Sequence, residues 1–225
     1  YMVDVHWGVK EAQYNYLKHA LYIAFFPQIL QGPLGEYKEL APQFYHKHEF
    51  CYLAAVNGMR RILWGFFKKL VVANNIQLIV DDVFDVHYMD YEGFLIWFFI
   101  LALYAFELYA DFSGYMDIVL GSAAMLGIKM DENFNAPYLS QNVSEYWRNW
   151  HITLGKWFRT YMFYPILRSK LFTAARKKLK KAGHPKLAAN CVTCAALFIV
   201  WFFTGLWHGA SWNFVLYGVY YGVLM

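Results

Sequence analysis

Long apolar runs alternate with short polar stretches along the chain. The clearest run is 94–108, whose one charge, Glu107, lies near its end. With the two residues that follow, it approaches the roughly 20 residues that a helix needs to cross a ~30 Å hydrocarbon core. The apolar segment 111–128 continues this run but contains Asp111 and Asp117. Carboxylates in such a segment indicate a position lined by protein or water rather than by lipid.

Three further runs predict membrane helices. Segment 14–31 is apolar and aromatic, and we expect its helix to end at Pro27 and at the Gln-Gly-Pro sequence 31–33. Segment 191–207 predicts another span, and 212–225 begins one more. Because only helices and closed barrels cross lipid, and these runs are too long for barrel strands, the pattern predicts an all-α membrane bundle.

Other segments mix charges with aromatic residues. Segment 51–80 reads as an amphipathic helix that lies partly in the membrane interface, with its basic side chains snorkelling towards water. Segment 146–165 is dense in Trp, Tyr and Phe but carries three cations, which favours a buried or interfacial helix. The turn-rich segment 129–145 contains 131–140, where a structural turn before a helix start is the stronger interpretation.

Composition and charge agree with a membrane protein. The chain is 59% hydrophobic and only 16% charged, whereas soluble domains have about 25% charged residues. Segment 146–225 has no acidic residue, whereas 168–186 carries eight cations. The positive-inside tendency therefore places that basic loop in the cytoplasm. No metal centre or nucleic-acid partner is predicted, and the Cys191/Cys194 spacing is better explained by two small residues on one helix face.

The basic loop itself has two interpretations. The simpler one is a solvated loop that sets the topology and contacts anionic lipid. The alternative is a docking surface for an acidic partner or a phosphate-bearing donor. The cations are Arg168, Lys170, Arg176, Lys177, Lys178, Lys180, Lys181 and Lys186.

Two histidines are candidates for chemistry. His208 lies in 187–225, which has no Asp, Glu, Lys or Arg, and an ionisable residue in such a stretch is usually kept for function. Gly205 and Gly209 flank it and permit unusual backbone angles or close approach by another group. From spacing alone, catalysis and a structural hydrogen bond are equally supported. Its distance from Lys186 would be about 33 Å if the intervening chain were helical throughout.

His151 lies in the aromatic segment. If this segment is one helix, His151 shares a face with the aromatic and apolar side chains at 147, 154, 158 and 161. A histidine in such a stripe is more often a core residue than a catalytic one, so the structural interpretation leads there.

Five strings in this chain together resemble the membrane-bound O-acyltransferase family, in the bacterial branch that contains alginate O-acetylation and teichoic-acid D-alanylation proteins. They occur in the family's order and cover roughly residues 25–215. The strings are Phe26-Pro27-Gln28 through Gly32-Pro33, Tyr109-Ala110-Asp111-Phe112-Ser113-Gly114-Tyr115, Glu132-Asn133-Phe134-Asn135 with Pro137-Tyr138, Trp147-Arg148-Asn149-Trp150-His151-Ile152-Thr153-Leu154 with Trp157-Phe158-Arg159, and Gly205-Leu206-Trp207-His208-Gly209.

The resemblance implies a polytopic helical bundle around a transmembrane tunnel, with re-entrant or interfacial helices. It implies that His208 is the catalytic histidine and that His151 is the second histidine of the family. We expect 1–225 to be a single core from a longer multi-pass protein of the bacterial inner membrane, without N-terminal and C-terminal helices. The expected substrate- or tunnel-lining residues are Trp147, Asn149, Trp150, Asp111, Ser113, Tyr115, Asn135 and Trp207.

The implied reaction moves an acyl group, in the first place acetyl, from a cytoplasmic thioester such as acetyl-CoA or an acyl-carrier protein, with no bound cofactor. The acceptor is a hydroxyl of an exported polysaccharide or of a partner protein, and the expected partners are an extracytoplasmic acyltransferase or an export system. Donor docking is expected at Arg168, Lys170 and 176–178.

Three alternatives remain open. D-alanyl transfer from a carrier protein to teichoic acid is the alternative within the family. A proton-coupled transporter would use His208 with Glu107, Asp111 and Asp117 as an ion path. A non-catalytic scaffold would tolerate replacement of both histidines.

Overall fold

The computed structural model describes residues 1–86, 92–183 and 185–225, and it divides into two compact units, 1–133 and 134–225. Most of the described residues are helical, and they form no strand; a single β-bridge links Phe134 and Trp150. This confirms the all-α fold class. Two described helices, α7 and α12, are long and apolar enough to cross a membrane. A single core with a tunnel stays a prediction.

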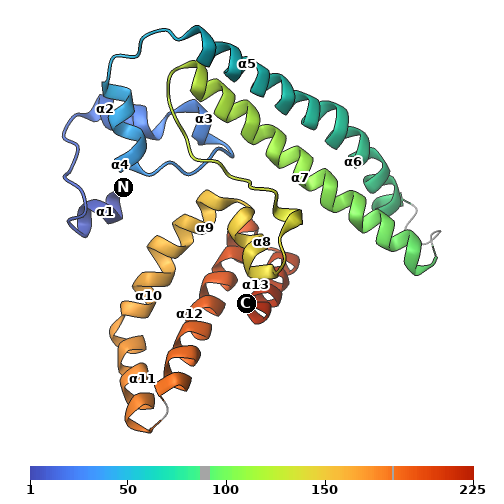
Figure 1. The fold of residues 1–225 in the computed structure, drawn as a ribbon. Coiled ribbons are helices and arrows are strands. Elements are labelled where there is room, and N and C mark those ends of the chain that lie inside the picture. The colour runs from blue at the N-terminus through green and yellow to red at the C-terminus, as the bar shows by residue number, and fades with distance from the viewer. Residues whose placement is uncertain (87–91, 184) are drawn as a thin grey trace. The chain divides into compact units, whose positions relative to one another are not determined.

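The first unit pairs one long helix with a rod of shorter helical segments (Figure 1). The N-terminal helices are followed by the rod, which runs from α5 through π-helical turns and α6, and then by α7. The bounds are α1 Met2–His6, α2 Tyr16–Ile23, α3 Phe26–Ile29, α4 Tyr37–Leu40, a 3₁₀ turn Ala41–Tyr45, α5 Tyr52–Phe66, a π-helical turn Phe67–Ala73, α6 Asn74–Asp81, a second π-helical turn Asp82–Val86, and α7 Phe94–Met125.

The membrane helix predicted for segment 14–31 was wrong, whereas the helix predicted for segment 94–108 was confirmed and is longer than expected. Segment 14–31 forms two short helices, because a helix continuing through Pro27 would drive the proline ring into the carbonyl of Ile23, which is where α2 ends. Segments 94–108 and 111–128, in contrast, form the single helix α7. Asp111 and Asp117 do not break it, because their side chains have partners.

Two glycine pairs set the contact between α5 and α7. An added Cβ on Gly58 would lie 2.6 Å from the carbonyl oxygen of Gly121, and one on Gly65 would lie 2.5 Å from that of Gly114. Each pair is separated from the next by seven residues on its helix, so the backbones approach closely at two successive levels, in the manner of small-residue contacts between membrane helices.

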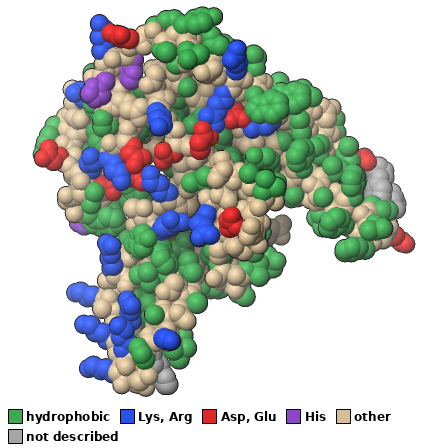
Figure 2. Space-filling view, viewed as in Figure 1, with side chains coloured by type: hydrophobic (Ala, Val, Ile, Leu, Met, Phe, Trp, Pro, Cys, Tyr) green, Lys and Arg blue, Asp and Glu red, His purple; other side chains and the backbone are tan. Residues whose placement is uncertain are grey.

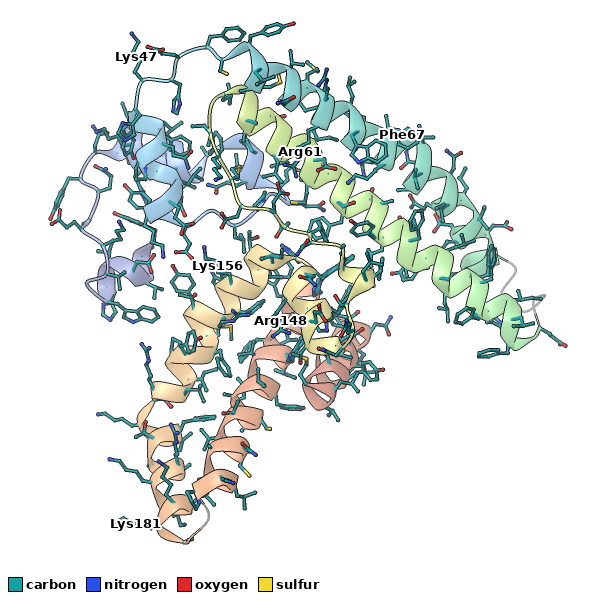
Figure 3. The ribbon with its side chains drawn as sticks, in the orientation of Figure 1. Lys47, Arg61, Phe67, Arg148, Lys156 and Lys181 are labelled. Atoms are coloured by element: carbon teal, nitrogen blue, oxygen red, sulfur yellow. The ribbon has the colours of Figure 1, made fainter. Side chains whose placement is uncertain are left out.

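Ion pairs join the same two segments close to these glycines. Arg61 extends from α5 towards α7 (Figure 3) and donates from Nε to Asp117 at 2.9 Å and from Nη2 to Glu132 at 2.6 Å. Lys68 Nζ lies 2.5 Å from Asp117, and Lys69 pairs with Asp111. The carboxylates of α7 are therefore lined by protein, as predicted. The snorkelling expected for segment 51–80 was wrong at Arg61, Lys68 and Lys69, because these cations neutralise α7.

The second unit is formed by helices that are all shorter than α7. The bounds are a 3₁₀ turn Pro137–Leu139, α8 Val143–Asn149, α9 Ile152–Phe158, a π-helical turn Arg159–Phe163, α10 Tyr164–Arg168, α11 Lys170–Lys181, α12 Pro185–His208 and α13 Trp212–Leu224. The segments α9 to α11 run alongside α12, which returns in the opposite direction, and α13 packs on α12 (Figure 1). Leu154 and Phe158 of α9 pack against Val200 of α12.

The basic segment 168–186 is mostly helix, so the prediction of a loop was wrong. Ser169 caps α11 by accepting a hydrogen bond from the backbone N–H of Phe172 at 3.4 Å. Lys and Arg are good helix formers, which explains why a run of cations folds this way. The helix ends before Gly183, whose φ of +87° suits a glycine.

Candidate active site

His208 is the last residue of α12, and its position depends on the way that α13 packs against this helix. An added Cβ on Gly205 would lie 2.3 Å from the carbonyl oxygen of Phe214, and one on Gly218 would lie 2.5 Å from that of Trp201. The two backbones are therefore in direct contact one turn before His208. The predicted close approach at Gly205 is confirmed, whereas neither Gly205 nor Gly209 has a positive φ.

This packing surrounds His208 with aromatic rings. Its imidazole stacks on Phe214 with ring centroids 6.2 Å apart, and it meets Tyr217 edge-to-face at 5.4 Å. The ring of the adjacent Trp207 meets it edge-to-face, with centroids 5.1 Å apart. The side chain of His208 is nevertheless exposed. The imidazole is thus held in place and remains accessible to a substrate.

His151 lies between α8 and α9 rather than within one helix. Its φ is +47° and its ψ is +55°, a left-handed conformation that is uncommon outside glycine. The turn is held because the N–H of Trp150 donates to the carbonyl of Tyr146 at 2.9 Å and the N–H of Gly155 donates to the carbonyl of His151 at 3.1 Å. The prediction of one continuous helical stripe through His151 was therefore wrong. A left-handed non-glycine residue is a form of local strain that clusters at functional sites.

The fold brings the two histidines into one neighbourhood. His151 meets Trp207 with ring centroids 6.2 Å apart, and Trp207 is adjacent to His208. Burial, and secondarily the charged form of His208, lower the pKa of His151 to about 4. His151 lies outside both candidate spans, and it is neutral at physiological pH.

The predicted lining residues fall into two groups. In the second unit, Trp147 meets Trp201 at 4.7 Å, and the amide of Asn149 donates to Ser140 Oγ at 3.1 Å. Trp150 stacks on Tyr146 at 5.8 Å, and the backbone N–H of Asn135 donates to the carbonyl of Asn149 at 3.0 Å. These contacts show that Asn149 and Asn135 support the turn that carries His151.

The other predicted lining residues lie on α7 in the first unit. Asp111 pairs with Lys69, and Ser113 Oγ accepts a hydrogen bond from Lys68 Nζ at 3.0 Å. Tyr115 is half-buried on the same helix. The first two side chains are thus part of the ion-pair system between α5 and α7.

The basic residues of the predicted donor dock are not beside the histidines. Arg168, Lys170 and Arg176–Lys178 lie on α10 and α11, which end near the start of α12. Helix α12 is unbroken from Pro185 to His208, so Lys186 and His208 are separated by about 33 Å of helix.

Four aromatic residues near the two histidines were not predicted from the sequence: Trp201, Phe214, Tyr217 and Tyr221. Tyr221 meets Trp147 at 4.8 Å and Trp201 at 5.4 Å, while Tyr217 lies between Trp147 and His208. Phe214 lies under His208. The spacing of Tyr217 and Tyr221, four residues apart on a helix, was the signal that they share a face.

The low pKa of His151 predicts a pH-dependent stability. An unfolded histidine titrates near 6.5, so between about pH 6.5 and 4 the unfolded chain binds a proton that folded His151 does not. The free energy of unfolding should therefore decrease as the pH falls through this window, by up to about 3 kcal/mol. Thermal unfolding in detergent from pH 7.5 to 4.5 measures this, with His151→Gln as the control. Equal pH slopes for the two proteins would contradict the prediction.

Comparison with known proteins adds independent findings. Residues 9–180 match the membrane-bound O-acyltransferase family. The probable alginate O-acetylase AlgI of Azotobacter vinelandii is 34% identical over 223 residues, which are 99% of this chain and 40% of that protein. The peptidoglycan O-acetyltransferase of Helicobacter pylori is 32% identical over 94% of the chain and 37% of its own length. The teichoic acid D-alanyltransferase of Bacillus subtilis is 28% identical over 96% of the chain and 54% of its own length. The chain thus spans about two fifths of the length of the first two relatives.

Proposed function

Because this chain belongs to the membrane-bound O-acyltransferase family, we propose that the full-length protein transfers an acyl group from a thioester donor to a hydroxyl group, with His208 as the general base. The acyl group is acetyl, and the acceptor is an exported cell-surface polysaccharide or a partner protein. Relatives named as alginate and peptidoglycan O-acetyltransferases support this choice.

The observation that carries the proposal is the shared aromatic neighbourhood of His151 and His208. His151 lies in the turn between α8 and α9, His208 ends α12, and both rings meet Trp207. His208 is exposed, so it is available to accept the proton of an attacking hydroxyl while the oxygen attacks the thioester carbonyl. His151, which is neutral and half-buried, acts as a positioning residue that orients this end of α12.

Acyl transfer also requires hydrogen-bond donors for the developing oxyanion. In the second unit, the proposed donors are the indole N–H of Trp150 and the side-chain amide of Asn149. The hydroxyls of Ser113 and Tyr115, which belong to the first unit, stay untested predictions. Trp147, Trp207 and Asn135 complete the proposed substrate-lining set of the second unit, and Asp111 of the first unit stays an untested prediction. Ser113 and Asp111 are held by lysines, and Asn149 is held by Ser140, so each has a defined orientation from which to act.

We place the protein in the bacterial inner membrane as a multi-pass protein around a tunnel. The thioester donor, acetyl-CoA or an acyl-carrier protein, approaches from the cytoplasmic side. The acceptor lies on the opposite side, with an extracytoplasmic acyltransferase or an export system as the partner. Family membership and the two apolar helices support a membrane location. Donor docking at the basic residues of α10 and α11 stays an untested prediction.

D-alanyl transfer to teichoic acid is the second candidate. It is favoured by the relative of that name in Bacillus subtilis, which aligns with 96% of this chain. This reaction would use the same histidine and the same type of thioester chemistry, so the two candidates differ in the acyl group and the acceptor.

Both candidates are tested by measuring esters on the cell surface. Cells that lack the gene are compared with cells that express the full-length protein, and esters are released from the surface polymer with mild base. Mass spectrometry then identifies the released acid. We expect acetate that depends on the protein, whereas protein-dependent D-alanine would select the second candidate. Ester levels that do not change with the protein would contradict both.

A further inference from the structure

Helix α11 has one basic face and one apolar face. At 100° per residue, Lys170, Lys177 and Lys181 lie opposite Phe172 and Leu179. Phe172 and Leu179 are half-buried, whereas every cation of α11 is exposed. In Figure 2, Lys and Arg side chains gather over this end of the second unit, and Figure 3 labels Lys181 at the tip. Segment 146–225 has no acidic residue that could neutralise them.

Helix α12, against which α11 packs, presents an apolar stripe to the surroundings. Leu187, Cys191, Cys194 and Phe198 recur at intervals of three and four residues, so they share one face, and all four are exposed. The stripe begins one residue after Lys186, the last cation of the chain. In a helix that crosses a membrane, this change from cation to exposed apolar side chains marks the boundary between headgroups and hydrocarbon.

The dimensions of the basic cluster match the headgroup layer. Arg176 to Lys181 rise about 8 Å along the helix, and the polar region on each side of a bilayer is roughly 5–8 Å thick. Leu171, which is 74% exposed, lies at the other end of α11 and adds an exposed apolar side chain to this helix. A mixed basic and apolar helix in this position has the pattern of a segment that contacts an anionic membrane surface.

We propose that the basic face of α11 is a binding surface for anionic phospholipid headgroups at the cytoplasmic side of the membrane. These contacts hold the α11–α12 hairpin at the membrane surface. The occupant is lipid rather than a protein or a soluble thioester for two reasons. The exposed apolar stripe of α12 places hydrocarbon directly beside the cations, and about 33 Å of helix separates Lys186 from His208.

The test uses full-length protein in nanodiscs and does not depend on acyl transfer. Thr173, which is exposed on α11, is replaced by cysteine and labelled with a fluorophore, in a background with Cys51, Cys191 and Cys194 replaced by serine. Quenching by headgroup spin-labelled phosphatidylglycerol is compared with quenching by spin-labelled phosphatidylcholine. We expect a severalfold preference for the anionic lipid, which decreases as salt shortens the Debye length from about 10 Å at 0.1 M to about 3 Å at 1 M.

Paired variants show whether the preference comes from α11. The variant Lys177→Gln/Lys178→Gln should abolish most of this severalfold preference, since each cation near the surface contributes up to about fivefold. The matched control Lys47→Gln/Lys129→Gln removes two exposed lysines of the first unit and should leave it unchanged. Equal quenching by both lipids, or a preference that survives the α11 substitutions, would overturn the proposal. If the label shows no lipid preference but its fluorescence changes when an acidic acyl-carrier protein is added, the surface binds a protein instead.

Discussion

Replacing His208 with alanine in the full-length protein is expected to lower acyl transfer by at least about 100-fold, and by up to about 10,000-fold, because a positioned general base contributes an acceleration of that size. The side chain is exposed at the end of α12, so its removal leaves no buried cavity. Transfer is measured as ester formed on the surface polymer per unit of membrane protein, and thermal unfolding of the variant is measured alongside.

The matched control is His46→Ala, which removes an exposed histidine of the first unit and should leave transfer unchanged. His151→Ala should reduce transfer less than His208→Ala does, because in our proposal His151 acts through its contacts and not on the hydroxyl. The double variant should be no slower than His208→Ala, since residues that act as a unit are not additive. Transfer by His208→Ala within threefold of wild type, at equal protein levels, would remove His208 from the reaction.

The apolar pattern predicted the long helices because their cause is local. Segments 94–108 and 111–128 are continuous in composition, and α7 is continuous in the structure. Segment 14–31 was expected to end at Pro27, but its apolar content did not show that α2 would stop at Ile23, which leaves it too short to cross a membrane. Pro27, which the sequence shows plainly, divides that segment and ends α2 four residues earlier.

The candidate site was predictable at its two histidines and much less so around them. His208 and His151 carry motifs, whereas Phe214, Tyr217 and Tyr221 belong to an apolar helix in which every large side chain suits a membrane. The contact that selects them is set by Gly205 against Gly218, and nothing in the sequence pairs these two glycines. The left-handed turn at His151 was hidden for a similar reason, since it is held by backbone hydrogen bonds from Trp150 and Gly155.

The charges of the first unit illustrate how pairing changes an interpretation. Asp111 and Asp117 in an apolar segment left an ion path open as an alternative when only their own segment was considered. Arg61, Lys68 and Lys69 of the neighbouring rod neutralise them, so they stabilise the α5–α7 contact. An ion path needs carboxylates that are free to bind the ion, whereas these two carboxylates are in contact with lysine and arginine side chains. Family membership and this pairing together favour acyl transfer over transport.

Gly205→Ala is expected to be strongly destabilising, although alanine is the better helix former by about 1 kcal/mol. The new Cβ would lie 2.3 Å from the carbonyl oxygen of Phe214, which belongs to the backbone and cannot rotate away. Helix α13 must therefore shift, at a typical cost of about 1–3 kcal/mol for overpacking. Since His208 packs on Phe214 and Tyr217, the same shift should also lower acyl transfer. Thermal unfolding and the surface-ester assay measure the two effects.

Gly155→Ala is the control that isolates this contact. Gly155 lies within α9 of the same unit, and the nearest atom to an added Cβ there is the carbonyl oxygen of Trp147 at 3.8 Å, an ordinary contact. With no close contact, helix propensity decides the sign, so this variant should be neutral or stabilised by up to about 1 kcal/mol. Gly218→Ala should reproduce the loss seen at Gly205, because its added Cβ meets the carbonyl oxygen of Trp201 at 2.5 Å. If Gly205→Ala and Gly155→Ala unfold at the same temperature, the glycine contact does not hold α13 against α12, and the aromatic surroundings of His208 must have another cause.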